Sequence, residues 1–288
     1  MTLALHKLTL AWPNLVDGSS VSGGSYTSAR PLGNVQQREL AERARSVDTD
    51  PANNQLLIEF DRRRTIGFIG IAAHNLSPDA TFRAYVRDAA DAVVVDTGDV
   101  LAWPPVLGLE QVAWEDPNFW TRQLDSEQRA EYTPFAWHVF EPTSLAHSVL
   151  LEINDAGNPD GYVEFGRVIV ADVWQPDTNM SFGSQWGHDD STTVQETEDG
   201  SAEFFDEAPR RRTFSAELGR LDQNEAFDVI ARMQRVQGTS REIVILNELA
   251  DTPQRHRRSM LARLVELDPI THPYAHNWTS SIAGREIL

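Results

Sequence analysis

The sequence predicts a mainly β protein, in which a β-sandwich domain is followed by a smaller α+β domain. Apolar strand patterns at residues 55–60, 65–71 and 80–87 predict the sandwich. In residues 80–87 apolar and polar side chains alternate, and in residues 65–71 glycines interrupt the strand, as they do at bulges. One well-capped helix among strand patterns near the end of the chain predicts the α+β domain. A polar, acidic stretch lies between the two patterns, so the predicted domains are residues 1–178 and 179–288.

The first domain is expected to begin with a strand in residues 1–10. Residues 11–53 are rich in Ser, Gly, Asn and Asp, which is loop composition, and residues 38–44 are expected to form one or two helical turns. Strands then follow between residues 56 and 95, with the His74-Asn75 pair serving a turn between two of them.

Residues 101–133 break this regularity. No apolar period of 2 or 3.6 persists there, and three tryptophans lie among prolines and acids, so we expect a long, aromatic-rich loop. Strands resume after the loop, at residues 135–140, 146–153 and 162–171. We expect the last of these strands to be bulged at Gly166.

The second domain is expected to open with a hairpin around Asp199-Gly200 and a strand at residues 211–218. A helix follows, with Asp222 as its N-cap, Glu225 in capping-box position and Gly238 at its C-terminal end. Two further strands are expected, at residues 243–246 and 260–267.

The composition excludes several classes of protein. The 288 residues include no cysteine, which excludes disulfides and cysteine nucleophiles, and no apolar run approaches the roughly 20 residues of a membrane helix. A formal net charge of −18 repels nucleic acid and anionic lipid, so we expect neither nucleic-acid binding nor membrane insertion. The basic triplets at residues 62–64 and 210–212 are expected to neutralise nearby acids or to pair with an acidic neighbouring subunit.

The sequence carries no phosphate-binding loop, nucleophile elbow or His-Glu-x-x-His motif. A glycoside hydrolase would need paired carboxylates, which Glu110, Glu115 and Asp116 would supply beside the tryptophans, but 43 acidic residues place such neighbours together by chance. Residues 158–161 lack the flanking ligands of a calcium loop, and the acids beside His188 lack a distant partner. We therefore expect no enzyme, no cofactor and no metal.

The residues that we single out for binding are Trp103, Trp114 and Trp120, in the long loop. They have three interpretations: they pack the loop onto the sandwich, they form a protein interface, or they stack on a sugar ring. The sequence leaves these three open.

Two segments carry a resemblance to a known family. Residues 65–85, with the run Thr-Ile-Gly-Phe-Ile-Gly-Ile-Ala-Ala-His-Asn-Leu-Ser, and residues 151–176 resemble the galactose-binding-like (discoidin-like) jelly rolls of tail proteins of long-tailed bacteriophages. The resemblance covers roughly residues 1–180. It implies a jelly-roll fold for the first domain and an assembly role for the second, and it brings no catalytic residue.

The resemblance implies a virion structural protein of the distal tail, tail tip or baseplate, which is assembled in the cytoplasm of the host bacterium. Its partners would be other copies of itself in a ring and neighbouring tail proteins. The alternative is a carbohydrate-binding module for attachment to a host-surface glycan, with a glycosidase as the third class.

Overall fold

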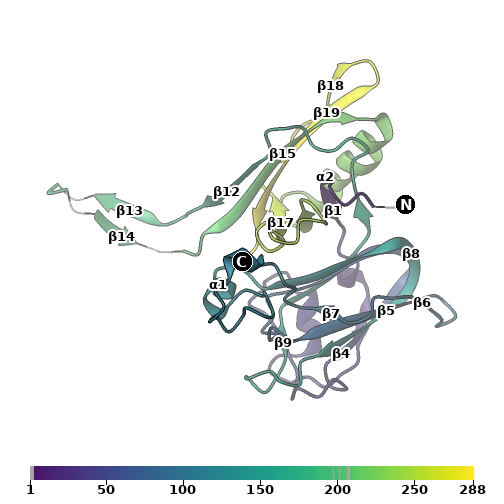
Figure 1. The fold of residues 1–288 in the computed structure, drawn as a ribbon. Coiled ribbons are helices and arrows are strands. Elements are labelled where there is room, and N and C mark those ends of the chain that lie inside the picture. Colours follow the sequence, from purple (N-terminus) through teal and green to yellow (C-terminus); the bar gives the residue numbers. More distant parts are fainter. Residues whose placement is uncertain (1–2, 197, 201, 206–207) are drawn as a thin grey trace. The chain divides into compact units, whose positions relative to one another are not determined.

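The computed structural model describes residues 3–196, 198–200, 202–205 and 208–288. The chain forms two compact units, Met1–Gln175 with Val244–Met260, and Pro176–Ile243 with Leu261–Leu288. Antiparallel strands dominate both units (Figure 1), so the prediction of a mainly β protein is confirmed. No helix in the described ranges is long and apolar enough to cross a membrane.

The first unit contains an antiparallel sheet with the strand order β10-β4-β8-β5-β6. In addition, β2 pairs with β4, and β7 pairs with β5. Its strands are β2 (Ser20–Ser22), β4 (Gln55–Ala72), β5 (Thr81–Arg87), β6 (Val93–Asp96), β7 (Val100–Leu101), β8 (Phe135–Asn154) and β10 (Arg167–Ala171). Smaller pairings join β3 (Ala44–Arg45) to β9 (Glu164–Phe165), and β1 (Thr9–Ala11) to both β11 (Val173–Trp174) and β16 (Glu242–Leu246). Short helical turns lie at η1 (Val16–Gly18), η2 (Leu32–Gln36), η3 (Leu109–Gln111) and α1 (Ser126–Ala130).

Two long strands, β4 and β8, organise this unit. Their pairing register shifts between Glu59 and Arg64 and again between Ile66 and Phe68. Such bulges bend a strand, and here residues from both halves of β4, including Ile58 and Ile66, are buried in one apolar core. The two halves of β4 therefore face one core, as the predicted sandwich requires, whereas residues 61–63 between them are exposed.

Glycines mark close backbone approaches in these strands, as the sequence indicated. A Cβ atom on Gly67 would lie 2.7 Å from methyl groups of Thr143 and Val173. A Cβ atom on Gly166 would lie 2.7 Å from the carbonyl oxygen of Leu40, and Gly166 separates β9 from β10. A bulge was predicted at Gly166; the structure instead has a break there, with β9 and β10 pairing with different strands.

The second unit is a smaller α+β unit. Its sheet pairs β12 (Gln185–Asp189) with β15 (Arg211–Leu221), β15 with β19 (Asn277–Glu286), and β19 with β17 (Ser259–Leu264) and β18 (Thr271–Tyr274). A separate hairpin of β13 (Thr193–Glu196) and β14 (Ala202–Phe205) lies at the end of a long extension of this unit (Figure 1). The predicted hairpin around Asp199-Gly200 is confirmed in the residues described.

The helix of the second unit begins with a π-helical turn, η4 (Glu225–Ala231), and continues as α2 (Arg232–Gln237). The Asp222 carboxylate accepts a hydrogen bond from the Glu225 backbone N–H at 2.7 Å, and the Glu225 carboxylate accepts one from the Asp222 N–H at 3.1 Å. This reciprocal pair is the predicted capping box. Gly238 ends the helix with a φ of +53°, also as predicted.

Three predictions differ from the structure. Residues 38–44 form turns that lead into β3, while the helical turn lies earlier, at η2, and the first strand is only β1. Residues 179–288 were predicted to form one domain, yet Val244–Met260 packs in the first unit. The reason is that β16 pairs with β1, a contact between chain ends that no local pattern signals.

Candidate functional site

The long loop between β7 and β8 is anchored at its base by buried side chains. Trp103 is 4% exposed, and its indole N–H donates to the Leu76 carbonyl at 3.0 Å. The Gln123 amide, 5% exposed, donates to the carbonyls of Pro78 and Trp103 at 2.8 and 2.7 Å. These bonds tie both ends of the loop to the turn between β4 and β5.

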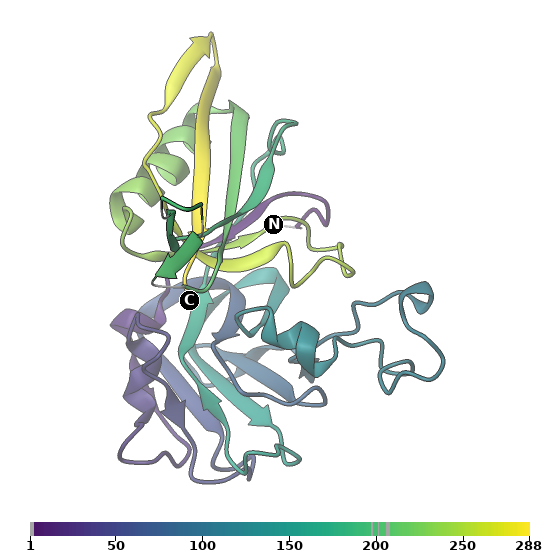
Figure 2. The same ribbon diagram turned by 90° about the vertical axis from the view of Figure 1, so that its left-hand side faces the viewer.

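Beyond this base the loop extends away from the strands of its unit (Figure 2). The N–H groups of Val106 and Leu107 both donate to the Arg122 carbonyl, at 2.9 and 3.0 Å, which closes the neck of the extension. The α1 turn follows, with Asp125 as its N-cap, accepting from the Gln128 N–H at 2.8 Å. Residues 108–121, which the neck encloses, are therefore held as a defined projection.

An aromatic cluster lies on this projection. We call the side chains of Trp114, Phe119 and Trp120 the aromatic tip. Their ring centroids lie 5.1–5.6 Å apart, and each pair of rings meets at 67–87°, the edge-to-face geometry that aromatic pairs favour. Trp114 and Trp120 are nonetheless 69% and 77% exposed, so a large aromatic surface faces solvent.

A cleft of about 480 Å³ is lined by residues that flank the aromatic tip in the sequence, although none of the three rings is part of its wall. Asp116 and Asn118, from the segment that joins Trp114 to Phe119, form part of its wall. Most of the remaining lining is also polar: Asp79, Gln111, Thr121, Gln123, Asp125, Ser126, Gln128 and Arg129. The cleft therefore offers hydrogen-bonding groups next to exposed aromatic rings.

The structure separates the three tryptophans that the sequence grouped together. Trp114 and Trp120 share the aromatic tip, whereas Trp103 lies in the core, with its ring 5.6 Å from that of His74 and 5.2 Å from that of His256. Trp103 thus takes the packing role that the sequence had left open, and it is not a surface residue. Phe119 completes the tip and was missed, because the sequence analysis weighed only tryptophans in this loop.

His74 serves the turn, as predicted. Its Nδ1 accepts a hydrogen bond from the Leu76 N–H at 3.2 Å, and the side chain is 4% exposed. Burial first of all, together with the positive charges of His256 and Arg43, lowers the pKa of His74 from 6.5 to about 3. The imidazole is therefore neutral at physiological pH.

The acids named in the sequence analysis do not gather into a reaction centre. Glu110 and Glu115 are exposed and are not part of the cleft wall, which takes only Asp116 from this group. Near His188, Asp189 pairs with Arg285 and Asp190 with Arg210. In the 158–161 turn, the Asn158 amide donates to Asp155 at 2.7 Å, which explains the turn without an ion.

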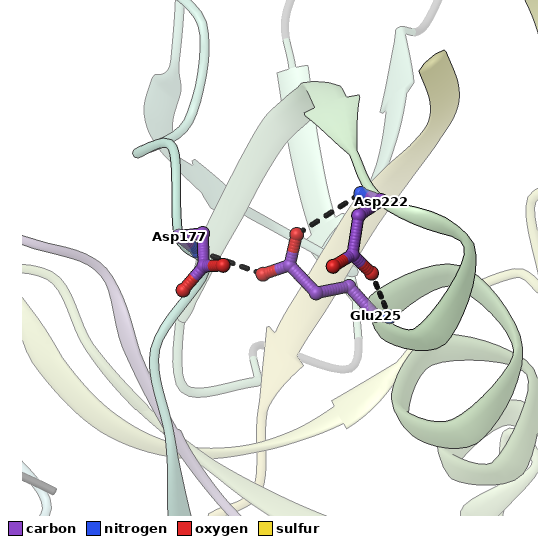
Figure 3. A group of neighbouring side chains, drawn as sticks. All are labelled: Asp177, Asp222 and Glu225. Atoms are coloured by element: carbon purple, nitrogen blue, oxygen red, sulfur yellow. Dashed lines mark hydrogen bonds between the residues drawn. The ribbon is translucent and has the colours of Figure 1, made fainter. Parts of the chain in front are cut away.

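One acidic cluster stands apart. Carboxylate oxygens of Asp177, Asp222 and Glu225 lie within 4.8 Å of one another (Figure 3). Both oxygens of Glu225 are engaged, one by the Asp177 N–H at 2.7 Å and the other by the Asp222 N–H. The start of the helix accounts for this convergence, and we assign no metal to it.

No family model and no curated protein matches this chain. Among solved structures, the chain is similar to the lectin binding domain of Lectinolysin complexed with Lewis b, with 12% identity, a TM-score of 0.37, and coverage of 56% of this chain and 96% of that one. It is also similar to a Streptococcus pneumoniae fucose binding module (9% identity, TM-score 0.36, 55% and 94% covered). A third is the family 32 CBM of C. perfringens NanJ in complex with galactose (11% identity, TM-score 0.37, 58% and 99% covered).

These matched structures are sugar-binding modules by their own descriptions. With identities of 12% or less and TM-scores below 0.5, the likenesses assign no ligand to this chain. Nothing in the comparisons indicates a phage tail protein, so that part of the sequence-based resemblance stays a proposal.

Proposed function

We propose that the protein is a non-catalytic binding protein whose aromatic tip and neighbouring cleft hold a carbohydrate. The exposure of Trp114 and Trp120 carries this proposal. A tryptophan side chain has about 150–250 Å² of surface to bury, and leaving two of them in water on a projecting loop is unfavourable without a ligand. The apolar face of a sugar ring covers such a surface well.

The size and polarity of the site favour a sugar over a protein partner. A stable protein interface buries about 800 Å² on each side, which three rings on one loop do not supply. The cleft volume of 480 Å³ falls within the roughly 300–1,000 Å³ of small-molecule sites. Its lining is mostly polar, which matches the many hydroxyl groups of a carbohydrate.

A glycan array followed by calorimetry on the best ligand tests the proposal. We expect Trp114→Ala and Trp120→Ala each to weaken binding about two- to tenfold, since stacking on one aromatic ring contributes about 0.5–1.5 kcal/mol. Tyr274→Ala is the matched control, because Tyr274 is 75% exposed but lies in the other unit. Absence of any glycan binding, or an equal loss in all three variants, would overturn the proposal.

The second candidate is a structural subunit of a bacteriophage tail that assembles into a ring with copies of itself and contacts neighbouring tail proteins. One observation favours it: β13 and β14 pair only with each other among the described residues, and a lone two-stranded hairpin is marginally stable in water. Phe182, near the start of the same extension, is fully exposed. An extension of this kind suits contact with another subunit.

With this second function, the protein would be assembled in the cytoplasm of the host bacterium and would then be part of the virion tail. Immunogold electron microscopy of particles from cells that carry the gene checks it, with label expected at the tail end distal to the head. Particles that lack the chain would exclude the tail role and leave the carbohydrate proposal intact.

A further inference from the structure

The extension of the second unit ends in a strongly acidic hairpin. We define the acidic hairpin as residues 190–209, which contain β13 and β14. This segment holds seven acidic residues and no lysine or arginine. Glu198 and Asp199 lie at its tip and are exposed, as is the apolar Val194. A basic surface would complement the charge of this segment.

Several arginines of the chain already pair with acids among the described residues. In the triplet at 210–212, Arg210 pairs with Asp190, and Arg212 pairs with Glu286 in a buried ion pair. Arg83 and Arg87 pair with acids on and near β6. The sequence-based expectation of local neutralisation is thus confirmed for Arg210 and Arg212.

The other triplet is different. Arg64 pairs with Asp61 at 2.8 Å, but Arg62 and Arg63 are exposed and make no ion pair within the part of the chain that the structure describes. They lie in β4 where its register with β8 jumps from Glu59 to Arg64. The pairing of β2 with β4 also stops at Glu59. The two arginines therefore lie on a stretch of β4 that has no registered partner residues in the described ranges, which we call the Arg62–Arg63 bulge.

We propose that the acidic hairpin of one copy docks on the Arg62–Arg63 bulge of another copy. Charge complementarity favours this occupant: a chain of net charge −18 repels its own copies, and a contact between exposed arginines and acids offsets that repulsion. An edge strand of the hairpin also has unpaired backbone groups that can form β-sheet hydrogen bonds with the unpaired backbone of the Arg62–Arg63 bulge. Because the two surfaces differ, the contact is head-to-tail and closes into a ring if the rotation permits.

This inference deepens the assembly candidate and is independent of the carbohydrate proposal. Sedimentation velocity of the full-length protein measures it. We expect concentration-dependent oligomers at about 0.05 M salt that dissociate at about 0.5 M, because screening weakens exposed charge pairs. The double variant Arg62→Glu with Arg63→Glu is expected to weaken association about tenfold or more, and so is Glu198→Lys with Asp199→Lys.

Combining the two pairs of substitutions exchanges the charges and is expected to restore association, which a merely misfolded variant would not do. Arg38→Glu with Arg241→Glu is the matched control, since it makes the same charge change at two other exposed arginines. Oligomers that persist in both reversed variants would overturn the docking contact and leave the assembly candidate standing. A wild-type protein that stays monomeric at all concentrations would overturn both.

Discussion

The base and the tip of the long loop use the same residue type for opposite purposes. At the base, Trp103 is buried, donates its N–H to a carbonyl, and packs against two histidines. At the tip, Trp114 and Trp120 contact mainly each other and Phe119 and remain exposed. The difference indicates that the base contributes to stability, and it is the reason for proposing that the tip binds a ligand. Four measurements break or sharpen this comparison.

The largest effect is expected from Trp103→Ala. Removing a buried tryptophan leaves a cavity and an unpaired Leu76 carbonyl, so the free energy of unfolding should fall by about 3–5 kcal/mol. Chemical denaturation followed by far-ultraviolet circular dichroism measures it. A loss below about 1 kcal/mol would show that the base is not the packed region described.

The second effect is a pH dependence that comes from His74. Its pKa is about 3 in the folded protein and about 6.5 in the unfolded chain, so the unfolded chain binds the extra proton between these values. The contribution of the neutral His74 to the free energy of unfolding is therefore complete above about pH 6.5. As the pH falls from there to about 3, this contribution decreases by about 1.4 kcal/mol per pH unit.

The free energies of unfolding of the wild type and of His74→Asn are measured from pH 7 to pH 4 in steps of about one pH unit. The difference between the two proteins isolates the contribution of His74. Asn preserves an acceptor for the Leu76 N–H but does not titrate. A difference that does not change with pH would contradict the assignment of a buried, neutral imidazole.

Gln123 joins the two regions, and its replacement should have an intermediate effect. Gln123→Leu keeps the volume but removes the donor to the buried carbonyls of Pro78 and Trp103, at a cost of about 1–3 kcal/mol. Gln111→Leu is the control, since this glutamine is exposed on the same cleft. Equal effects in thermal melts of the two variants would mean that the anchor is not specific.

The smallest effect on stability is expected at the tip. Trp114→Ala or Trp120→Ala should change the free energy of unfolding by no more than about 0.5 kcal/mol, because exposed side chains contribute little to folding. The same denaturation curves provide the comparison with Trp103→Ala. A loss above about 1.5 kcal/mol at either position would place the tip with the structural base and remove the reason to propose a ligand there.

Local chemistry was predictable from the sequence where it depends on neighbours in the chain. The Asp222–Glu225 capping box and the positive φ at Gly238 both follow from residue type and short spacing. The strands at 211–218 and 243–246 followed from apolar patterns and correspond to β15 and β16.

Long-range features were not predictable in this way. The strand β19 was missed because several of its buried positions are not apolar: Ser280 is 3% exposed, and Glu286 is buried through its ion pair with Arg212. The sequence does not show which of the three tryptophans is buried, because a loop lacks the regular spacing of apolar residues that identifies the buried face of a helix or strand. What distinguishes Trp103 is its contact with Leu76 and the two histidines, which the fold alone brings together.

The path of the backbone has a mechanical consequence. The polypeptide crosses from one unit to the other three times, at residues 175–176, 243–244 and 260–261. A single protease cut at the first crossing divides the chain into two fragments, and only non-covalent contacts such as the pairing of β1 with β16 then hold the first unit together. Truncation after Gln175 would likewise strip β16 from β1, so the first unit cannot be obtained intact as an N-terminal fragment.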